Sequence, residues 1–97
     1  MANGLVLQFP AGVGEAEYDS VNAKLNFNPR TGEGDWPEGL LSHAAGAADG
    51  GGWVVTETWD SKEAQGAFMA SRLGPALAGM PEPSVVWFDI AASQHRH

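Results

Sequence analysis

Cysteine is missing from this sequence, and several kinds of chemistry are missing with it. Without a thiol the chain can form no disulfide, no thiolate nucleophile and no iron–sulfur or thiolate zinc site. The absence fits a reducing cytoplasm, where we expect the protein to work. Positive charge is scarce as well, because 5 cationic residues stand against 12 acidic ones and the net charge is -7. Such a surface repels nucleic acid and anionic membranes, so we expect neither as a partner.

Long apolar runs are also absent. The start, MANGLVLQFPAG, lacks both the charged segment and the apolar length of a signal peptide. No stretch approaches the length of a membrane span. Apolar residues at 43% and charged residues at 18% are ordinary globular values. We therefore expect one soluble globular domain over residues 1–97.

The first half of the sequence predicts a strand and then a helix. The apolar run GLVLQF (Gly4–Phe9), closed by Pro10, is typical of a strand. The next segment is rich in acidic residues at its start, where they favour the helix dipole. Pro29 bars this helix from continuing, and residues 28–39 have the composition of a loop. The helical spacing is carried by Tyr18, Val21, Asn22 and Leu25.

The second half predicts a hairpin, a helix and a last strand. LLSHAAGA, ADGG and GWVVTETW are typical of a strand, a tight turn and a second strand. The helix after them can be capped by Asp60 or Ser61, and Glu63 has capping-box spacing from Asp60. Gly74–Pro75 should bend or restart this helix, because a residue before proline avoids the α region. SVVWFDIA, residues 84–91, is the last strand.

The order βαββαβ predicts an α+β protein with the ferredoxin-like plan, a four-stranded antiparallel sheet with two helices on one face. The other face of the sheet is then bare, although the strands carry apolar residues on both sides. Burial of one apolar side chain is worth about 1.5–3 kcal/mol, so an uncovered apolar face favours association. We expect a homodimer in which two copies cover each other's sheets. The apolar strand residues are Leu5, Val6, Leu7, Phe9, Trp53, Val54, Val55, Val85, Val86, Trp87 and Phe88.

Three segments carry a resemblance to a known family: YDSVNAKL, PEGLLSHAAG and GGGWVVTETWDSKEAQGAFMASRLGPAL. Over most of its length the chain resembles the dimeric α/β-barrel superfamily, and within it the antibiotic-biosynthesis-monooxygenase-like domains. The resemblance implies two sheets packed face to face, with a ligand cavity between sheet and helices or inside the barrel. It also implies a range of activities: cofactor-free oxidation of polyketide phenols, quinol oxidation, haem degradation or lactone isomerisation. A ferredoxin-like fold alone licenses none of them.

His43 is the first candidate for chemistry, because it stands in the middle of a predicted strand between small residues. A neutral imidazole can take a proton near neutral pH, or bind a metal or haem iron. The structural alternative is a histidine that merely donates to a neighbouring backbone group or hydroxyl. The resemblance, which places a histidine in this strand, supports the functional interpretation.

Whether His43 faces Glu57 depends on the register of the hairpin between them, since a slip of one residue reverses the faces. A two-residue loop at Asp49–Gly50 places His43 opposite Thr56, on the other face. A three-residue loop, or a bulge at the glycines, places His43 opposite Val55 and beside Glu57. In that case a buried His–Glu pair would fix the imidazole tautomer and raise its basicity.

Further candidates are polar and aromatic residues that a ligand could contact. Glu57 and Trp59 share a strand face, and Tyr18 and Asn22 lie one helical turn apart. Asn22 could donate to a bound carbonyl or to a developing enolate oxygen. The structural alternatives are core packing for the aromatic residues, a salt bridge with Arg72 or a dimer contact for Glu57, and a bond to a neighbouring strand or helix for Asn22. We expect catalytic roles for His43, Glu57 and Asn22, and substrate binding by Trp59, Tyr18, Phe68, Trp87 and Arg72.

Metal and nucleotide motifs are absent. No HExxH, CxxC or Ser-His-Asp spacing occurs, and the glycines of GVGE and GEGD lack the lysine of a phosphate loop. His95 and His97 have strand-like spacing and could hold a metal, but a terminal tail is the simpler interpretation. We expect no metal and no cofactor, which leaves any oxidation to the substrate's own reactivity unless haem binds. The Asn-Trp-His set of a haem-degrading site does not align with this sequence.

Two functions from different classes fit these residues. The first is a cofactor-independent monooxygenase acting on an aromatic or polyketide-like molecule, with His43 as the base and Asn22 or Glu57 holding the charge or the tautomer. The second is a non-catalytic dimer that binds a small ligand or serves as a structural module. The two differ in the interior, because catalysis needs an open cavity that reaches His43 and a filled core needs none.

Overall fold

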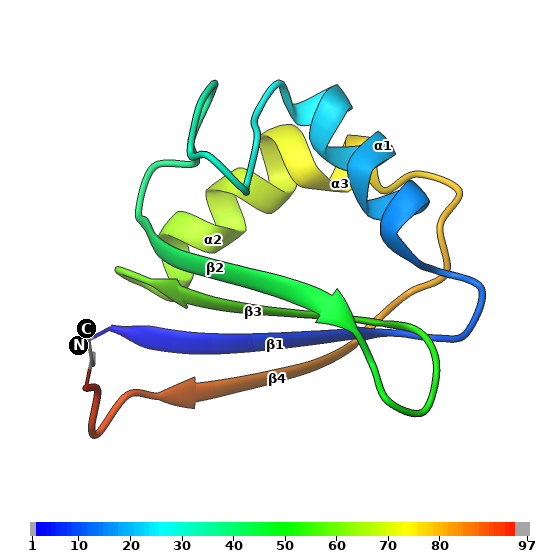
Figure 1. Cartoon of the computed structure of the whole chain (residues 1–97). Coiled ribbons are helices and arrows are strands. Elements are labelled where there is room, and N and C mark those ends of the chain that lie inside the picture. The colour runs from blue at the N-terminus through cyan, green and yellow to red at the C-terminus, as the bar shows by residue number, and fades with distance from the viewer. Residues whose placement is uncertain (1, 95–97) are drawn as a thin grey trace.

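A computed structural model describes residues 2–94 as one antiparallel sheet covered on one face by helices (Figure 1). The helical segment after β3 is continuous and contains a π turn, η1. The order βαββαβ and the strand order β2-β3-β1-β4 confirm the predicted ferredoxin-like fold. His95 and His97 lie outside the described residues. The elements are β1 (Asn3–Phe9), α1 (Glu15–Leu25), β2 (Leu40–Ala47), β3 (Trp53–Trp59), α2 (Lys62–Phe68), η1 (Met69–Leu73), α3 (Gly74–Ala76) and β4 (Ser84–Asp89).

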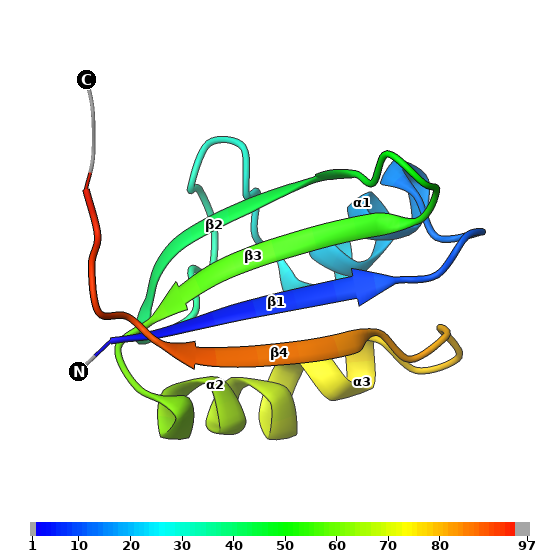
Figure 2. The same cartoon turned by 90° about the horizontal axis from the view of Figure 1, so that it is seen from below.

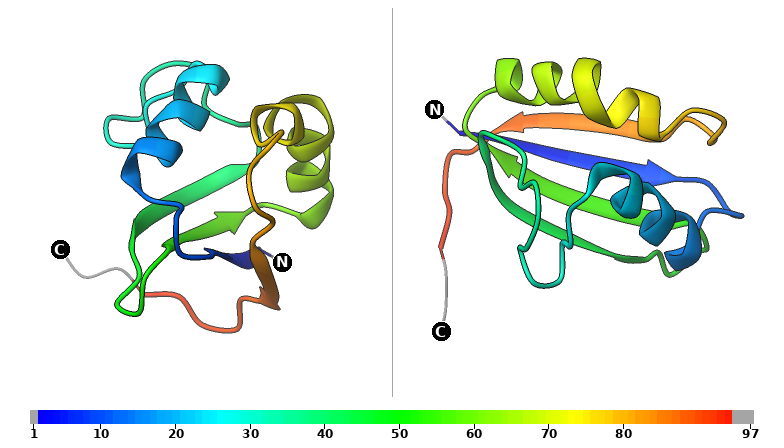
Figure 3. Two further views of the ribbon diagram at one scale, coloured as in Figure 1. Left: turned by 90° about the vertical axis from the view of Figure 1, so that its right-hand side faces the viewer. Right: turned by 90° about the horizontal axis from the view of Figure 1, so that it is seen from above.

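The helices divide the covered face of the sheet between them. Viewed from above, α1 lies over the β2–β3 half and the segment from α2 to α3 lies over the β1–β4 half (Figure 3). α1 begins where the Glu17 carboxylate accepts a hydrogen bond of 2.7 Å from the Gly14 N–H. It ends at Asn26, whose φ of 57° is left-handed and stops the helix. This placement sets the inner side of α1 directly above β2 and β3.

The second helical segment differs in detail from the sequence prediction. Ser61, rather than Asp60, caps α2, and its hydroxyl accepts a 3.1 Å hydrogen bond from the Ala64 N–H. The predicted bend at Gly74–Pro75 takes the form of the π turn η1 followed by α3. A Cβ on Gly74 would lie 2.8 Å from the Met69 carbonyl oxygen, so glycine permits the close approach inside this turn.

The core lies between the helices and the covered face of the sheet. Leu5, in the interior strand β1, stands opposite Glu57 in β3 and Trp87 in β4. Its side chain is 1% exposed, and Trp59 is 0% exposed. The buried apolar residues are Leu5, Leu7, Phe9, Val13, Val21, Leu25, Phe27, Leu40, Trp53, Val55, Trp59, Phe68, Leu73 and Ala76.

The loop between β2 and β3 comprises residues 48–52, and residues 49–51 form its tip. The N–H of Ala48 donates to the Gly52 carbonyl oxygen at 3.1 Å, which closes the hairpin around them. Gly52 has φ of 88°, and a Cβ there would lie 2.2 Å from the Phe9 carbonyl oxygen. Glycine is therefore required at this corner, both for its left-handed backbone and for the approach of β1.

This loop decides the register that the sequence leaves open. His43 pairs with Glu57, so the alternative that places it opposite Thr56 is wrong. A three-residue loop was expected to place His43 opposite Val55, and that partner is also wrong. The observed partner, Glu57, lies two residues further along β3 on the same face. Side chains of Val55 and Glu57 point the same way, so the predicted meeting of His43 with Glu57 occurs.

Figure 2 shows the sheet from its open side. This face carries a more mixed set of residues than the apolar strand sequences suggest. Alternation in the register places Val6, Val54, Val86 and Phe88 on this face, together with polar residues. Val86 is 56% exposed and Phe88 is 50% exposed. Val85 and Trp87 alternate with Val86 and Phe88 and lie on the helix side of the sheet. The polar residues of the open face are Gln8, Ser42, Thr56 and Thr58.

Candidate functional site

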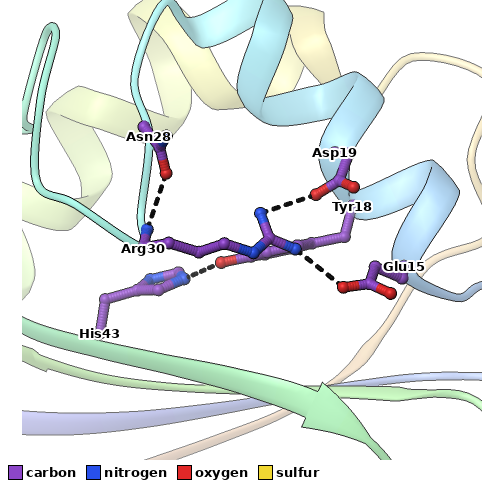
Figure 4. A network of polar contacts seen from close by, with 6 residues as sticks. All are labelled: Glu15, Tyr18, Asp19, Asn28, Arg30 and His43. Atoms are coloured by element: carbon purple, nitrogen blue, oxygen red, sulfur yellow. Dashed lines mark hydrogen bonds and ion pairs between the residues drawn. The ribbon is translucent and has the colours of Figure 1, made fainter.

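Four side chains form one hydrogen-bonded series across α1, β2 and β3. The phenol of Tyr18 is hydrogen-bonded to Nε2 of His43, as the close-up shows (Figure 4). Nδ1 of His43 lies 2.9 Å from Oε2 of Glu57, and Nε1 of Trp59 donates to Oε1 of Glu57 at 2.9 Å. Sequence analysis proposed all four residues, and the structure brings them together.

Burial of the central pair limits the protonation patterns that fit. The side chains of His43 and Glu57 are each 7% exposed. Trp59 can only donate its N–H, so it needs an acceptor, and an ionised Glu57 supplies one to both neighbours. With Nδ1–H donating to Glu57, the lone pair on Nε2 accepts the hydrogen of the Tyr18 phenol. In this tautomer Nε2 is the basic nitrogen of His43, and it faces Tyr18.

Tyr18 is held in its protonated form. Burial raises the pKa of the Tyr18 phenol above its usual value of 10.0, and the charges of Glu57 and Asp19 add to the increase. The Asn22 amide and the Arg30 guanidinium act in the opposite direction and lower this pKa. The phenol therefore keeps its proton at neutral pH and can donate it to His43.

Arg30 covers the Tyr18 ring from the solvent side, and sequence analysis did not single it out. Its guanidinium lies 6.0 Å from the centre of the Tyr18 ring and forms ion pairs with Asp19 at 2.9 Å and Glu15 at 3.0 Å (Figure 4). Its backbone N–H donates to Oδ1 of Asn28 at 2.9 Å. The sequence signal for Arg30 was the alternating charge of residues 28–39. In a loop, the spacing of charged residues does not predict where their side chains point.

An inner cavity of about 50 Å³ lies between the helices and the sheet. Of the expected site residues, Tyr18, Asn22, His43, Glu57 and Phe68 line it, whereas Trp59, Trp87 and Arg72 do not. Its walls are almost wholly apolar. They are completed by Leu7, Phe9, Val13, Val21, Leu25, Phe27, Pro37, Leu40, Trp53, Val55, Leu73, Leu77 and Met80.

The three residues outside the cavity have other contacts. Arg72 donates to the carbonyl oxygens of Leu25 at 2.7 Å and Asp35 at 2.8 Å, so the suggested salt bridge between Arg72 and Glu57 is wrong. The ammonium of Lys62 lies 5.6 Å from the centre of the Trp87 ring. Trp59 is fully buried and contacts Glu57, which indicates a positioning role rather than contact with a substrate.

A second, outer pocket of about 290 Å³ opens on the other side of the same side chains. Tyr18, His43 and Trp53 belong to the walls of both spaces, so these three side chains are the partition at which the two spaces adjoin. The remaining walls of the outer pocket are Glu15, Pro29, Arg30, Ala44 and Ala45.

Two buried hydrogen-bond donors beside the inner cavity lack an acceptor. Nδ2 of Asn22 and Nε1 of Trp53 form no hydrogen bond of good geometry within residues 2–94, although the Asn22 amide lies near enough to the Tyr18 phenol to lower its pKa. Asn22 is 6% exposed and Trp53 is 7% exposed. Buried donors are nearly always paired, so two together beside a cavity favour a ligand with acceptor atoms. Sequence analysis treated Trp53 only as a strand residue, because nothing in the pattern shows an unpaired indole nitrogen.

The site offers little to a metal or haem. Within residues 2–94, no group of three or more His, Cys, Asp and Glu residues could hold a metal ion. Both ring nitrogens of His43 are engaged, by Tyr18 and Glu57, so neither is free to ligate haem iron in this arrangement. No helix in the described part of the chain is long and apolar enough to cross a membrane.

Comparisons with solved structures define the class by its fold. The chain has TM-scores of 0.70 to a protein from Chloroflexus aurantiacus thought to be an antibiotic biosynthesis monooxygenase, and 0.66 to SnoaB, a cofactor-independent oxygenase from Streptomyces nogalater. The first is 16% identical with 98% of each chain covered, and SnoaB is 16% identical with 95% of each chain covered. A third structure, from Deinococcus radiodurans and described in similar terms, has a TM-score of 0.62, 14% identity, and covers 100% of this chain and 99% of its own. No protein-family model and no curated protein sequence matches the chain.

These similarities establish the fold. The chain is a small ferredoxin-like α+β protein whose architecture is that of antibiotic-biosynthesis-monooxygenase-like structures, as the resemblance in sequence predicted.

Proposed function

We propose that the protein is a cytoplasmic, cofactor-independent monooxygenase that acts on a small aromatic phenol. The observation that carries this proposal is the series from Tyr18 through His43 and Glu57 to Trp59, which orients the imidazole in the wall of the outer pocket. Bases of this kind contribute about 10²–10⁴-fold to reaction rates. The likeness of the fold to a cofactor-independent oxygenase supports the same chemistry.

The outer pocket suits the substrate. Its volume of about 290 Å³ lies at the lower end of the range for ligand pockets, about 300–1,000 Å³, and fits a molecule of one or two rings. The rings of Tyr18 and His43 are nearly parallel, with an interplanar angle of 17°. Together with Trp53, they offer aromatic surface to a planar ligand.

The proposed reaction begins with loss of the substrate's phenolic proton. When the substrate hydroxyl displaces the Tyr18 phenol from Nε2 of His43, the imidazole takes the proton and Glu57 stabilises the imidazolium. The phenolate then transfers one electron to oxygen, and the phenoxyl radical and superoxide combine through a new C–O bond. Loss of water from the hydroperoxide gives a quinone, so a phenol and O₂ become a quinone and H₂O.

Oxygen uptake tests this proposal directly. A panel of one- and two-ring phenols and quinols should include substrates that consume oxygen and yield quinones in the absence of metal. His43→Gln should reduce the rate by about 100-fold or more, because it removes the base. Ser42→Ala, a change on the opposite face of the same strand, should retain the rate. The second function, a non-catalytic ligand-binding module, would be supported by phenols that bind to the outer pocket without any oxygen uptake.

We also propose that the protein is a homodimer joined through its open sheet faces. Val6, Val54, Val86 and Phe88 would be buried between two copies, and two of them are half exposed in the single chain. Analytical ultracentrifugation at micromolar concentration should show a dimer. Val86→Asp should convert it to a monomer, because the substitution places a charge in the dimer interface. A wild-type monomer under these conditions would rule out this assembly.

A further inference from the structure

We propose that the inner cavity binds molecular oxygen, while the organic substrate occupies the outer pocket. This inference rests on the proposed function and divides its two substrates between the two spaces. Tyr18, His43 and Trp53 line both spaces, so oxygen in one and a phenolate in the other would meet across a single layer of side chains.

The size of the inner cavity favours a very small ligand. A water molecule needs about 10–15 Å³, and an engineered cavity of about 150 Å³ binds benzene or xenon. At about 50 Å³ the inner cavity is too small for an aromatic ring but large enough for a diatomic molecule. The outer pocket, at about 290 Å³, has room for the ring that the inner cavity excludes.

The walls of the inner cavity favour an apolar gas over water. Most of the surface comes from aliphatic and aromatic side chains, among them Leu7, Val21, Val55 and Leu73. A buried water molecule needs two to four polar partners. The polar groups of Tyr18, His43 and Glu57 are already hydrogen-bonded to one another. A water molecule in the cavity would be left with the N–H groups of Asn22 and Trp53, the fewest partners that a buried water requires.

The unpaired donors give the cavity a role in the reaction. Neutral oxygen gains little from the N–H groups of Asn22 and Trp53, but superoxide would accept hydrogen bonds from them. Donors that strengthen as charge develops lower the barrier to electron transfer from phenolate to oxygen. The electron leaves the phenolate and arrives on O₂. Tyr18, displaced from His43 by the substrate hydroxyl, no longer separates the two spaces, so superoxide can reach the phenoxyl radical and form the C–O bond. The proton held on His43 then passes to the distal oxygen of the new hydroperoxide. Asn22, predicted to donate to a bound carbonyl or to a developing enolate oxygen, would instead donate a hydrogen bond to superoxide.

The direct test is the paramagnetic effect of dissolved oxygen on the methyl signals of the wild-type protein. Under oxygen pressure, the methyl protons of Leu7, Val21 and Val55 should relax faster than those of Val85, which is 52% exposed. Relaxation that simply follows exposure to solvent would overturn the proposal. Cross-relaxation of the same methyl groups with bound water would overturn it as well.

A filled cavity provides a matched comparison. Val55→Ile adds one methylene group to the cavity wall, and Val85→Ile adds the same group at an exposed position. The first change should abolish the oxygen effect on Leu7 and raise the KM for oxygen, while the second should alter neither. If Val55→Ile does not fold, Val21→Ile fills the cavity from the helix side, and the wild-type measurement still decides.

The donors have a separate signature. Trp53→Phe keeps the aromatic surface but removes the N–H, so kcat should fall by about tenfold or more while the oxygen effect on the methyl groups remains. An unchanged kcat would remove the donors from the reaction. Oxygen binding without oxidation of any phenol would overturn the proposed function alone. Oxidation without oxygen in the cavity would overturn this inference alone.

Discussion

His43 and Glu57 stand directly opposite each other across β2 and β3, with 2.9 Å between Nδ1 and Oε2. Backbone pairing alone therefore sets the contact between the base and its carboxylate. Trp59, two residues further along β3 on the same face, donates to the other carboxylate oxygen. The geometry of this site is thus built on two paired strands rather than on loops.

Replacing the carboxylate with an amide should destabilise the fold. In Glu57→Gln the amide nitrogen must face either His43 or Trp59, and both of those neighbours donate. One buried donor then loses its acceptor, which costs about 1–3 kcal/mol in the free energy of unfolding. Urea unfolding measures the loss, with the exposed Glu63→Gln in α2 as the matched control, expected within about 0.5 kcal/mol of wild type. Equal stability of the two variants would show that His43 carries its proton on the other nitrogen.

Tyr18 is the only tyrosine in the chain, so its ionisation can be followed by ultraviolet absorbance without interference. The midpoint should lie above 10.0 in the folded protein, because burial disfavours the phenolate. Glu57→Gln should lower the midpoint, since the negative charge of Glu57 contributes to the increase. A denaturant-unfolded sample supplies the reference, expected near 10. A folded midpoint at or below that reference would contradict the burial of the phenol.

The same pKa increase makes stability depend on alkaline pH. Because the pKa of Tyr18 is higher in the folded state, the unfolded chain loses its proton first as the pH rises. The contribution is complete below the unfolded value of 10.0 and is lost as the pH rises through the folded value. Tyr18→Phe should therefore show a flatter loss of stability than wild type above this pH. Parallel curves in urea unfolding at several alkaline pH values would argue against this linkage.

Gly52→Ala should distort the hairpin that sets the register. Its Cβ would lie 2.2 Å from the Phe9 carbonyl oxygen, and its φ of 88° strains any L-residue with a side chain. The expected loss is about 1–3 kcal/mol in the free energy of unfolding. Gly50→Ala, in the same loop, has open space around the new Cβ and should behave like wild type. A similar effect of both changes would point to loop entropy rather than to the contact with β1.

The fold could be predicted because its signals are local. Apolar runs bounded by Pro10 and by the glycines of the hairpin predict strands, and the acidic start of α1 predicts a helix. Their order then restricts the topology to very few arrangements. Alternation along one strand also placed Glu57 and Trp59 on one face without any knowledge of the tertiary structure.

The candidate site could be predicted only in part, because it depends on distances that the pattern does not contain. The strand partner of His43 depends on how many residues of the glycine-rich segment form the hairpin loop. The alternation of apolar residues does not predict that number. The position of Arg30 depends on the path of an irregular loop, and the unpaired nitrogen of Trp53 depends on what surrounds it. Trp87 has inward strand spacing, yet only the sheet order shows that β4 lies away from the cavity.

Because β2 lies at the edge of the sheet and β3 lies in its interior, His43 is held less firmly than Glu57. Glu57 belongs to β3, which is bonded to strands on both sides, whereas His43 belongs to a strand with a neighbour on one side only. Local opening of β2 requires fewer hydrogen bonds to break, so its amides should exchange with solvent before those of β3. The base can therefore withdraw from the partition on a fast, local fluctuation while its carboxylate stays in place.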